Sequence, residues 1–260
     1  MKTRIKLLSF FGIIALMGLL FTLPSFAGSL VAYWSFDEGP GDILKDNSGT
    51  GNDGEVSKGC EWVEGVFGKA MEFNGSDSYV LVKNHDSYNF GKEDSFSISL
   101  WANYDAKGDW QGLLQKFNGG YPFKVEVNTA NELYFSIWDQ VNNPGAIIGD
   151  VSGDWHHCCF LRDAKNKMLY AYLDGELKKE SNDTITDEIA NAVDLYIGAR
   201  TPGNTITYIG LLDEIAIYNR LLTEDEIGGS LDGKLPETKG ATVSLKHSLI
   251  DTWGSIKNSN

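Results

Sequence analysis

The stretch Leu212-Asp-Glu-Ile-Ala-Ile-Tyr-Asn-Arg-Leu-Leu-Thr-Glu-Asp-Glu-Ile227 joins a strand pattern to a helix start late in the chain. Leu211–Tyr218 is rich in apolar and aromatic residues over the length of a strand, which predicts a β-strand. Thr223 and Glu226 follow with the spacing of a capping box, in which each side chain accepts a hydrogen bond from the other residue's backbone amide. The sequence therefore predicts a final strand followed by one short helical turn.

The rest of the chain has an all-β pattern, because short apolar and aromatic runs alternate with turn residues and no helical period is sustained before Tyr218. Asp174-Gly175 suits the positive φ angles of a type I′ hairpin, and Asn118-Gly-Gly120 precedes Pro122 at a strand start, where a missing amide hydrogen costs least. The number of strands suits two packed antiparallel sheets. The other strands that we expect are Leu30–Phe36, Tyr79–Val82, Phe96–Tyr104, Gly112–Phe117, Phe123–Val127, Glu132–Trp138, Trp155–Arg162, Lys167–Leu173, Glu176–Glu180 and Asp194–Ile197.

Two of these runs show which residues face the core. In 96–102 apolar residues alternate with serines and Trp101, and in 132–138 Leu133, Phe135 and Ile137 alternate with Tyr134, Ser136 and Trp138. Side chains on a strand point alternately to its two faces, so one face of each strand enters the core. The opposite faces form a second surface that is open to solvent or to a ligand.

Five further motifs precede the stretch quoted above: Trp34-Ser-Phe-Asp-Glu-Gly39, Ala70-Met-Glu-Phe-Asn-Gly75, Ser95-Phe-Ser-Ile-Ser-Leu-Trp101, Trp155-His-His157 and Tyr172-Leu-Asp-Gly175. Together the six motifs resemble the laminin-G-like, concanavalin A-like jelly-roll domains from about Leu30 to Ile227. The resemblance implies a two-sheet antiparallel β-sandwich over residues 28–228, with a short C-terminal helical segment. The turn-forming stretch Gly228-Gly-Ser230 marks the boundary, and residues 229–260 form a tail, in which His247–Lys257 has roughly helical apolar spacing. This tail is a peripheral amphipathic helix, a docking or sorting segment, or a disordered end.

Residues 1–27 have the pattern of a secretory signal peptide: three basic residues, an apolar run and small residues before Gly28. An uncleaved amino-terminal anchor is the alternative. Cleavage would remove three positive charges and change the formal net charge from −14 to −17. This acidity argues against a nucleic-acid partner. No later stretch reaches the ~18 apolar residues of a membrane span. We therefore expect an exported protein, periplasmic or extracellular.

The chain has three cysteines, Cys60, Cys158 and Cys159, which are too few for a disulfide framework. Adjacent strand residues point to opposite faces, so at most one of Cys158 and Cys159 faces the core. Oxidation after export could join Cys60 to either neighbour, and we take Cys159 as the candidate partner. The alternative is that the thiols stay free and buried.

Asp37 and Asp213 are the candidate metal ligands, because the terminal strands of a jelly roll commonly pair and would bring them together. The resemblance implies one structural Ca²⁺, held by an amino-terminal acid, a turn carbonyl and a carboxy-terminal Asp, which correspond to Asp37, Gly75 and Asp213. Ca²⁺ prefers such oxygen ligands. The alternative is that both carboxylates make turn and edge hydrogen bonds without a metal. His156 and His157 are neighbours on a predicted strand and cannot together chelate one zinc ion.

Aromatic faces stack on sugar rings, and polar side chains read the hydroxyl groups. On this basis the candidate ligand-binding residues are Trp138, Asp139, Asn142, Arg200 and Tyr208, which lie in or beside predicted strands and the polar loops 139–145 and 200–205. Arg200 could hold a carboxylate or a sulfate with two parallel hydrogen bonds.

No strand has the alternating carboxylates of a jelly-roll glucanase, and no nucleophile elbow, P-loop or zinc-protease motif occurs. The sequence therefore predicts a secreted, non-catalytic, lectin-like module that recognises carbohydrate or glycoprotein and holds structural calcium. One alternative is an adhesion or structural module that contacts another surface protein without sugar specificity. The other is a glucanase-type glycoside hydrolase.

Overall fold

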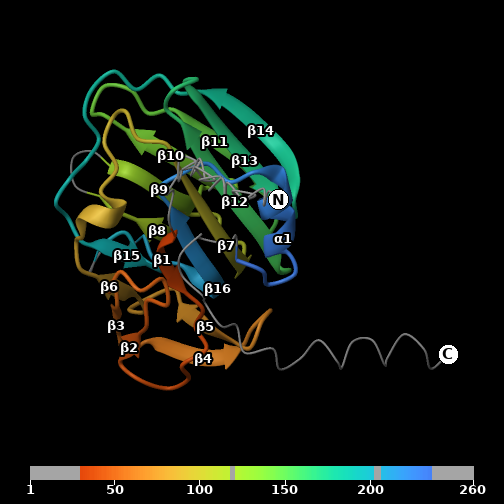
Figure 1. The fold of residues 1–260 in the computed structure, drawn as a ribbon. Helices are drawn as coiled ribbons and strands as arrows, with labels where there is room; N and C mark the ends of the chain where they lie inside the picture. The colour runs from red at the N-terminus through yellow and green to blue at the C-terminus, as the bar shows by residue number, and fades with distance from the viewer. Residues whose placement is uncertain (1–29, 118–120, 202–205, 236–260) are drawn as a thin grey trace, which may run out of the picture.

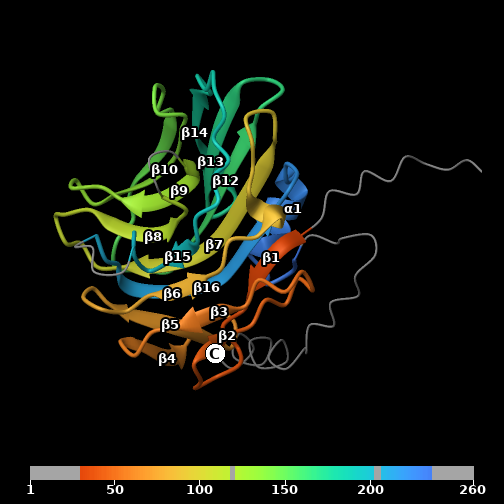
Figure 2. The same cartoon turned by 90° about the vertical axis from the view of Figure 1, so that its left-hand side faces the viewer.

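The computed structural model describes residues 30–117, 121–201 and 206–235, which form two antiparallel sheets packed face to face (Figures 1 and 2). The expected signal peptide, the Asn118-Gly-Gly120 turn and the tail from residue 236 lie outside these residues. No helix among the described residues is long and apolar enough to cross a membrane. The predicted all-β sandwich is confirmed.

The first sheet contains both the first strand and the last strand of the described chain. Leu30 of its amino-terminal strand pairs with Tyr218 of its last strand, as expected for the terminal strands of a jelly roll. In spatial order its strands are β14 (Glu176–Asn182), β13 (Met168–Leu173), β12 (His156–Asp163), β7 (Phe96–Tyr104), β16 (Ile209–Tyr218), β5 (Lys69–Asn74) and β4 (Cys60–Glu64), and β1 (Leu30–Trp34) also pairs with β16.

The second sheet is built largely from the middle of the chain. A short 3₁₀ turn, η1 (Asp86–Tyr88), follows one of its strands. In spatial order the strands are β11 (Gly145–Asp150), β10 (Glu132–Trp138), β9 (Tyr121–Val127), β8 (Gln111–Gln115), β15 (Leu195–Ile197), β6 (Val80–Val82), β3 (Gly54–Val56) and β2 (Ile43–Leu44).

The main hydrophobic core lies between the sheets, and the alternation read from the sequence decides which side chains enter it. On β7, Phe96, Ile98 and Leu100 are buried in this core. On β10, Leu133, Phe135 and Ile137 are buried there too. The intervening residues of both strands therefore face away from the core, as predicted.

Helix α1 (Glu224–Ser230) begins at the predicted capping box, in which Thr223 accepts from the amide of Glu226 and the Glu226 carboxylate accepts from the amide of Thr223. The helix lies against the outer side of the first sheet (Figure 2) and buries Ile227 in a second, smaller apolar cluster. It runs through Gly228 and Gly229, so the packed structure extends beyond the expected boundary at residue 228.

The Asp174-Gly175 turn joins β13 to β14 with φ angles of +49° and +81°, as a type I′ turn requires. The expected Cys60–Cys159 disulfide is wrong, because all three cysteines are free. Strands β5, β16 and β7 separate β4 from β12, and at about 4.8 Å per strand the two thiols are too far apart to bond. Cys158 and Cys159 face opposite sides of the sheet, as predicted.

Candidate functional site

A carboxylate cluster, defined here as Asp37, Asp213 and Glu214, lies where the end of β1 meets β16. Strand β16 contains a bulge between Asp213 and Ala216, and Glu214 within it has a φ angle of +52°. Bulges of this kind re-aim side chains and are common beside functional sites. Two acidic residues that are adjacent in sequence are thereby brought next to Asp37.

The cluster holds the tight turn between β4 and β5. Asp213 Oδ2 accepts hydrogen bonds from the amides of Val66 (2.9 Å) and Phe67 (3.2 Å), and Asp37 Oδ1 accepts from the amide of Lys69 (3.0 Å). Gly68 permits this approach, because a Cβ atom there would lie 2.0 Å from Asp37 Oδ1. Backbone donors and two glycines, Gly65 and Gly68, thus place the turn directly on the carboxylates.

The cluster carries more negative charge than its surroundings balance. Burial, and then the neighbouring charge of Glu214, raise the pKa of Asp213 to about 8, and burial raises the pKa of Glu214 to about 7. Glu214 accepts a hydrogen bond from the Tyr33 hydroxyl at 2.6 Å. Asp213 Oδ1 is buried and has no hydrogen-bond partner among the described residues. A buried, unpaired carboxylate oxygen is a suitable ligand for a hard cation.

The three predicted metal ligands do not all come together. Asp37 and Asp213 are neighbours, but Gly75 follows Asn74, which pairs with Ile209, four residues before Asp213 on β16. At ~3.3 Å per residue this places Gly75 more than 10 Å away along the strand. Its carbonyl accepts instead from the Thr207 hydroxyl. Within the described residues, no three His, Cys, Asp or Glu side chains form a metal-holding group, so a cation here would also need backbone or water oxygens.

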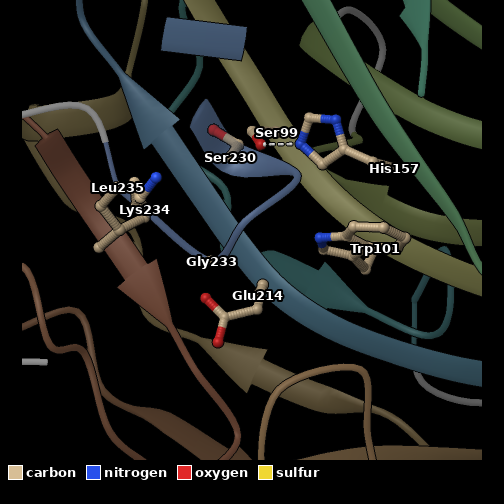
Figure 3. A pocket seen from close by; sticks show the side chains of 8 residues that line it. All are labelled: Ser99, Trp101, His157, Glu214, Ser230, Gly233, Lys234 and Leu235. Carbon is tan, nitrogen blue, oxygen red and sulfur yellow. Dashed lines mark hydrogen bonds between the residues drawn. The ribbon is translucent and has the colours of Figure 1, made fainter. Parts of the chain in front are cut away.

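A shallow pocket lies beside the cluster, between the first sheet and the segment after α1 (Figure 3). Ser99 Oγ lies 2.8 Å from His157 Nε2 on one side of the pocket, and Glu214 lies on another. The buried indole nitrogen of Trp101 has no hydrogen-bond partner within the part of the chain that the structure describes. The free volume of the pocket is about 10 Å³. That space suits one water molecule and excludes a sugar.

The second candidate site is on the outer face of the second sheet. We call it the ring surface, and it consists of four half-buried aromatic side chains over β8, β9 and β10: Trp110, Phe117, Tyr134 and Trp138. The Tyr134 ring extends over Gly145 of the neighbouring strand β11, which pairs with Ser136, and a Cβ atom at Gly145 would lie 2.4 Å from the ring. Such rings, part buried and part exposed, are suited to stacking against a flat apolar ligand face.

Beneath the rings lies a charged group of side chains, the Arg200 network, formed by Arg200, Glu126, Lys124 and Gln115. Glu126 is fully buried, forms an ion pair with Lys124, and accepts from Gln115 Nε2 (2.8 Å) and Arg200 Nη2 (3.3 Å). The Lys124 ammonium group lies 5.1–5.5 Å from the ring centres of Trp110, Tyr121 and Tyr134. Burial lowers the pKa of Lys124, and the nearby Arg200 charge adds to this effect.

The candidate ligand residues fall into three groups. Trp138 is part of the ring surface, and Arg200 is part of the Arg200 network. Asp139 and Asn142 have structural roles, because the buried Asp139 carboxylate accepts from the amides of Val141, Asn142 and Thr186 and joins two loops. Burial alone would raise the pKa of Asp139, but these donors hold it well below its ordinary value.

Tyr208 is not a ligand residue. It is fully buried in the main core, its ring packs edge-on against Phe73, and its hydroxyl donates to the carbonyls of Leu211 and Asn103. The sequence could not show this, because an aromatic residue beside a polar loop can point either way. The sequence analysis did not select Tyr134 of the ring surface, or Lys124 and Glu126 of the Arg200 network. Their signal was the alternation of Lys124 and Glu126 with the apolar residues of β9.

The strand order of the two sheets defines an antiparallel jelly-roll sandwich. A family model described as the concanavalin A-like lectin/glucanases superfamily matches residues 74–228, and the chain belongs to this superfamily. The expected family is therefore confirmed.

Relatives by sequence include the non-toxic nonhemagglutinin type A of Clostridium botulinum, 27% identical over 207 residues, which cover 76% of this chain and 16% of that protein. Botulinum neurotoxin type X of Clostridium botulinum is 24% identical over 193 residues, which cover 71% of this chain and 14% of the toxin. The chain thus spans about a sixth of the length of these curated relatives.

Similar solved structures share the fold. The binding domain of Paraclostridial Mosquitocidal Protein 1 has a TM-score of 0.66 at 21% identity, covering 79% of this chain and 52% of that one. The botulinum neurotoxin serotype D ligand binding domain, in complex with N-acetylneuraminic acid, has a TM-score of 0.63 at 13% identity, covering 79% and 51%.

Proposed function

We propose that this chain is an exported, non-catalytic carbohydrate-binding module. The observation that carries the proposal is the ring surface: four half-buried aromatic rings on one sheet face, placed over a fixed set of polar side chains. Sugar-binding sites combine these two elements, with ring stacking for affinity and polar groups for orientation. A structural neighbour solved with N-acetylneuraminic acid supports a glycan ligand. The ligand of this chain is a glycan or the glycan of a glycoprotein.

The carboxylates of this surface support binding without hydrolysis. A glycosidase needs two carboxyl groups flanking the scissile bond. The central outward positions of β9 hold Lys124 and Glu126, and Glu126 is already paired with Lys124 and Arg200. Glu126 is fully buried, Lys124 contacts its Oε1 and both Gln115 and Arg200 contact its Oε2, so neither oxygen is free to contact a scissile bond.

Glycan-array binding of the purified protein tests the proposal. We expect binding to a related set of glycans, and at least tenfold weaker binding for Tyr134→Ala and Trp138→Ala, since stacking against a half-buried ring is lost. Tyr170→Ala is the matched control, because Tyr170 is a half-buried ring on the opposite sheet. An array with no bound glycan would contradict the proposal and favour a protein partner. Equal weakening by all three variants would remove the ring surface from the mechanism.

We also propose that the carboxylate cluster binds one Ca²⁺ ion. The unpaired Oδ1 of Asp213 and the carboxylate of Asp37 would be its side-chain ligands, and the ion would neutralise the charge that raises the pKa values of Asp213 and Glu214. Isothermal titration calorimetry with Ca²⁺ tests this. We expect one site in the wild type and none in Asp213→Asn, and an unchanged titration in the variant would exclude the cluster.

A further inference from the structure

We infer that the glycan of the ring surface carries an anionic group, a carboxylate or a sulfate, and that Arg200 binds it. The inference rests on the proposed function and names the ligand class at that site. Arg200 is the cation of its network that solvent reaches: its side chain is 20% exposed, against 8% for Lys124, and Glu126 is fully buried. A ligand that lies on the rings therefore meets a guanidinium group first.

The charges of the Arg200 network do not balance. Lys124 and Arg200 share one carboxylate, that of Glu126, and Gln115 is neutral. One positive charge is left over in a partly buried position, on a chain whose net charge is −14. An anionic group on the ligand would supply the missing charge, and its attraction is strengthened where water is displaced.

Arg200 is also held in one orientation before any ligand arrives. Its guanidinium carbon lies 4.8 Å from the centre of the Phe117 ring, Nε donates to Gln115 Oε1 at 3.3 Å, and Nη2 donates to Glu126. These two hydrogen bonds use two of the five N–H groups of an arginine. A guanidinium group fixed on an aromatic face recognises carboxylate and sulfate with little loss of side-chain entropy.

The stacking ring of Tyr134 and the guanidinium group of Arg200 share one neighbour on the sheet face, Glu126. Glu126 is the direct cross-strand partner of Tyr134, and it is also bonded to Arg200. Side chains of directly paired residues lie about 5 Å apart at Cβ. Arg200 is the second neighbour of Glu126. A sugar that stacks on Tyr134 would therefore direct one of its substituents toward Arg200. Glu126, Gln115 and Phe117 are positioning residues in this arrangement.

The test is binding of one neutral core sugar in three forms: lactose, sialylated lactose and sulfated lactose, together with the glycan array. We expect one or both acidic forms to bind at least tenfold more tightly than lactose, and this advantage to fall as NaCl is raised, since exposed charges are screened. The carboxylated and sulfated arms identify which anion the site prefers.

Two variants separate the inference from the proposed function. Arg200→Gln should remove the advantage of the acidic forms over lactose, whereas Arg200→Lys should keep part of this advantage, because the charge stays and only the planar fork is lost. Thermal unfolding confirms that both variants fold. If neutral and acidic glycans bind equally to the wild type and to Arg200→Gln, the inference is overturned while the proposed function stands. If no glycan binds, both are overturned.

Discussion

His157 is a neutral imidazole inside an acidic protein. It is 1% exposed, its Nε2 atom lies 2.8 Å from Ser99 Oγ, and its Nδ1 atom has no partner among the described residues. Burial lowers its pKa to about 4, below the ordinary 6.5. The unfolded chain therefore binds a proton at this residue at a higher pH than the folded chain does. The resulting stability is present above pH 6.5 and is lost as the pH falls toward 4.

We expect His157 to weaken the fold by up to about 3 kcal/mol between pH 7 and pH 4, at about 1.4 kcal/mol per pKa unit. The measurement is urea unfolding at several pH values for the wild type and His157→Gln, whose free energies of unfolding should converge as the pH falls. His85→Gln, at an exposed histidine, is the control. A constant difference between wild type and His157→Gln across this range would show that His157 does not titrate as inferred.

At the scale of elements, the β4–β5 turn should depend on the carboxylate beneath it. Gly68→Ala puts an alanine at a φ angle of +72° and a Cβ atom on Asp37 Oδ1. We expect a loss of about 1–2 kcal/mol from the backbone and a further ~1 kcal/mol from the displaced hydrogen bond to Lys69. Gly49→Ala is the matched control, because Gly49 has a φ angle of +86° with no atom within 4 Å.

A double-mutant cycle measured by chemical denaturation checks the contact with Asp37. In an Asp37→Ala background the carboxylate is absent, so Gly68→Ala should cost no more than Gly49→Ala. If Gly68→Ala costs the same with and without Asp37, the carboxylate does not hold the turn.

Elements with a strong local signal could be predicted from the sequence, and those that depend on partners could not. β7 and β10 have the predicted bounds because their apolar residues alternate over seven or more positions. β2 and β3 are two and three residues long, and β11 contains Gly145 and Gly149. Such segments become strands only because a neighbouring strand accepts and donates their backbone hydrogen bonds. The same holds for β4 and β5, which the sequence analysis also missed.

At the scale of the whole molecule, strand order decides which parts of a site are predictable. Pairing of β1 with β16 is a general property of the fold, so Asp37 and Asp213 could be matched from sequence. Gly75 could not be placed, because its distance from Asp213 depends on the register of β5 against β16. The Arg200 network joins β8, β9 and the segment after β15, which no local pattern connects.

The net charge of −14 makes any cation stabilise the molecule to some degree, so a specific calcium effect must exceed this general screening. Without bound metal, the raised pKa values of Asp213 (about 8) and Glu214 (about 7) mean that the folded chain retains protons that the unfolded chain has released. The stability from these two groups is therefore complete below about pH 4 and declines as the pH rises toward 8.

Calcium should replace those protons and cancel this decline. We expect Ca²⁺ at a hundred times its Kd to stabilise the fold by about 2.7 kcal/mol at pH 8, with a smaller effect at pH 5, where protons compete. Thermal unfolding in Ca²⁺, in Mg²⁺ at equal concentration, and with a chelator measures it. In the Asp213→Asn variant Ca²⁺ and Mg²⁺ should raise the thermal stability equally, because only the general screening of negative charge remains. Equal effects of Ca²⁺ and Mg²⁺ on the wild type at both pH values would assign the whole gain to net charge.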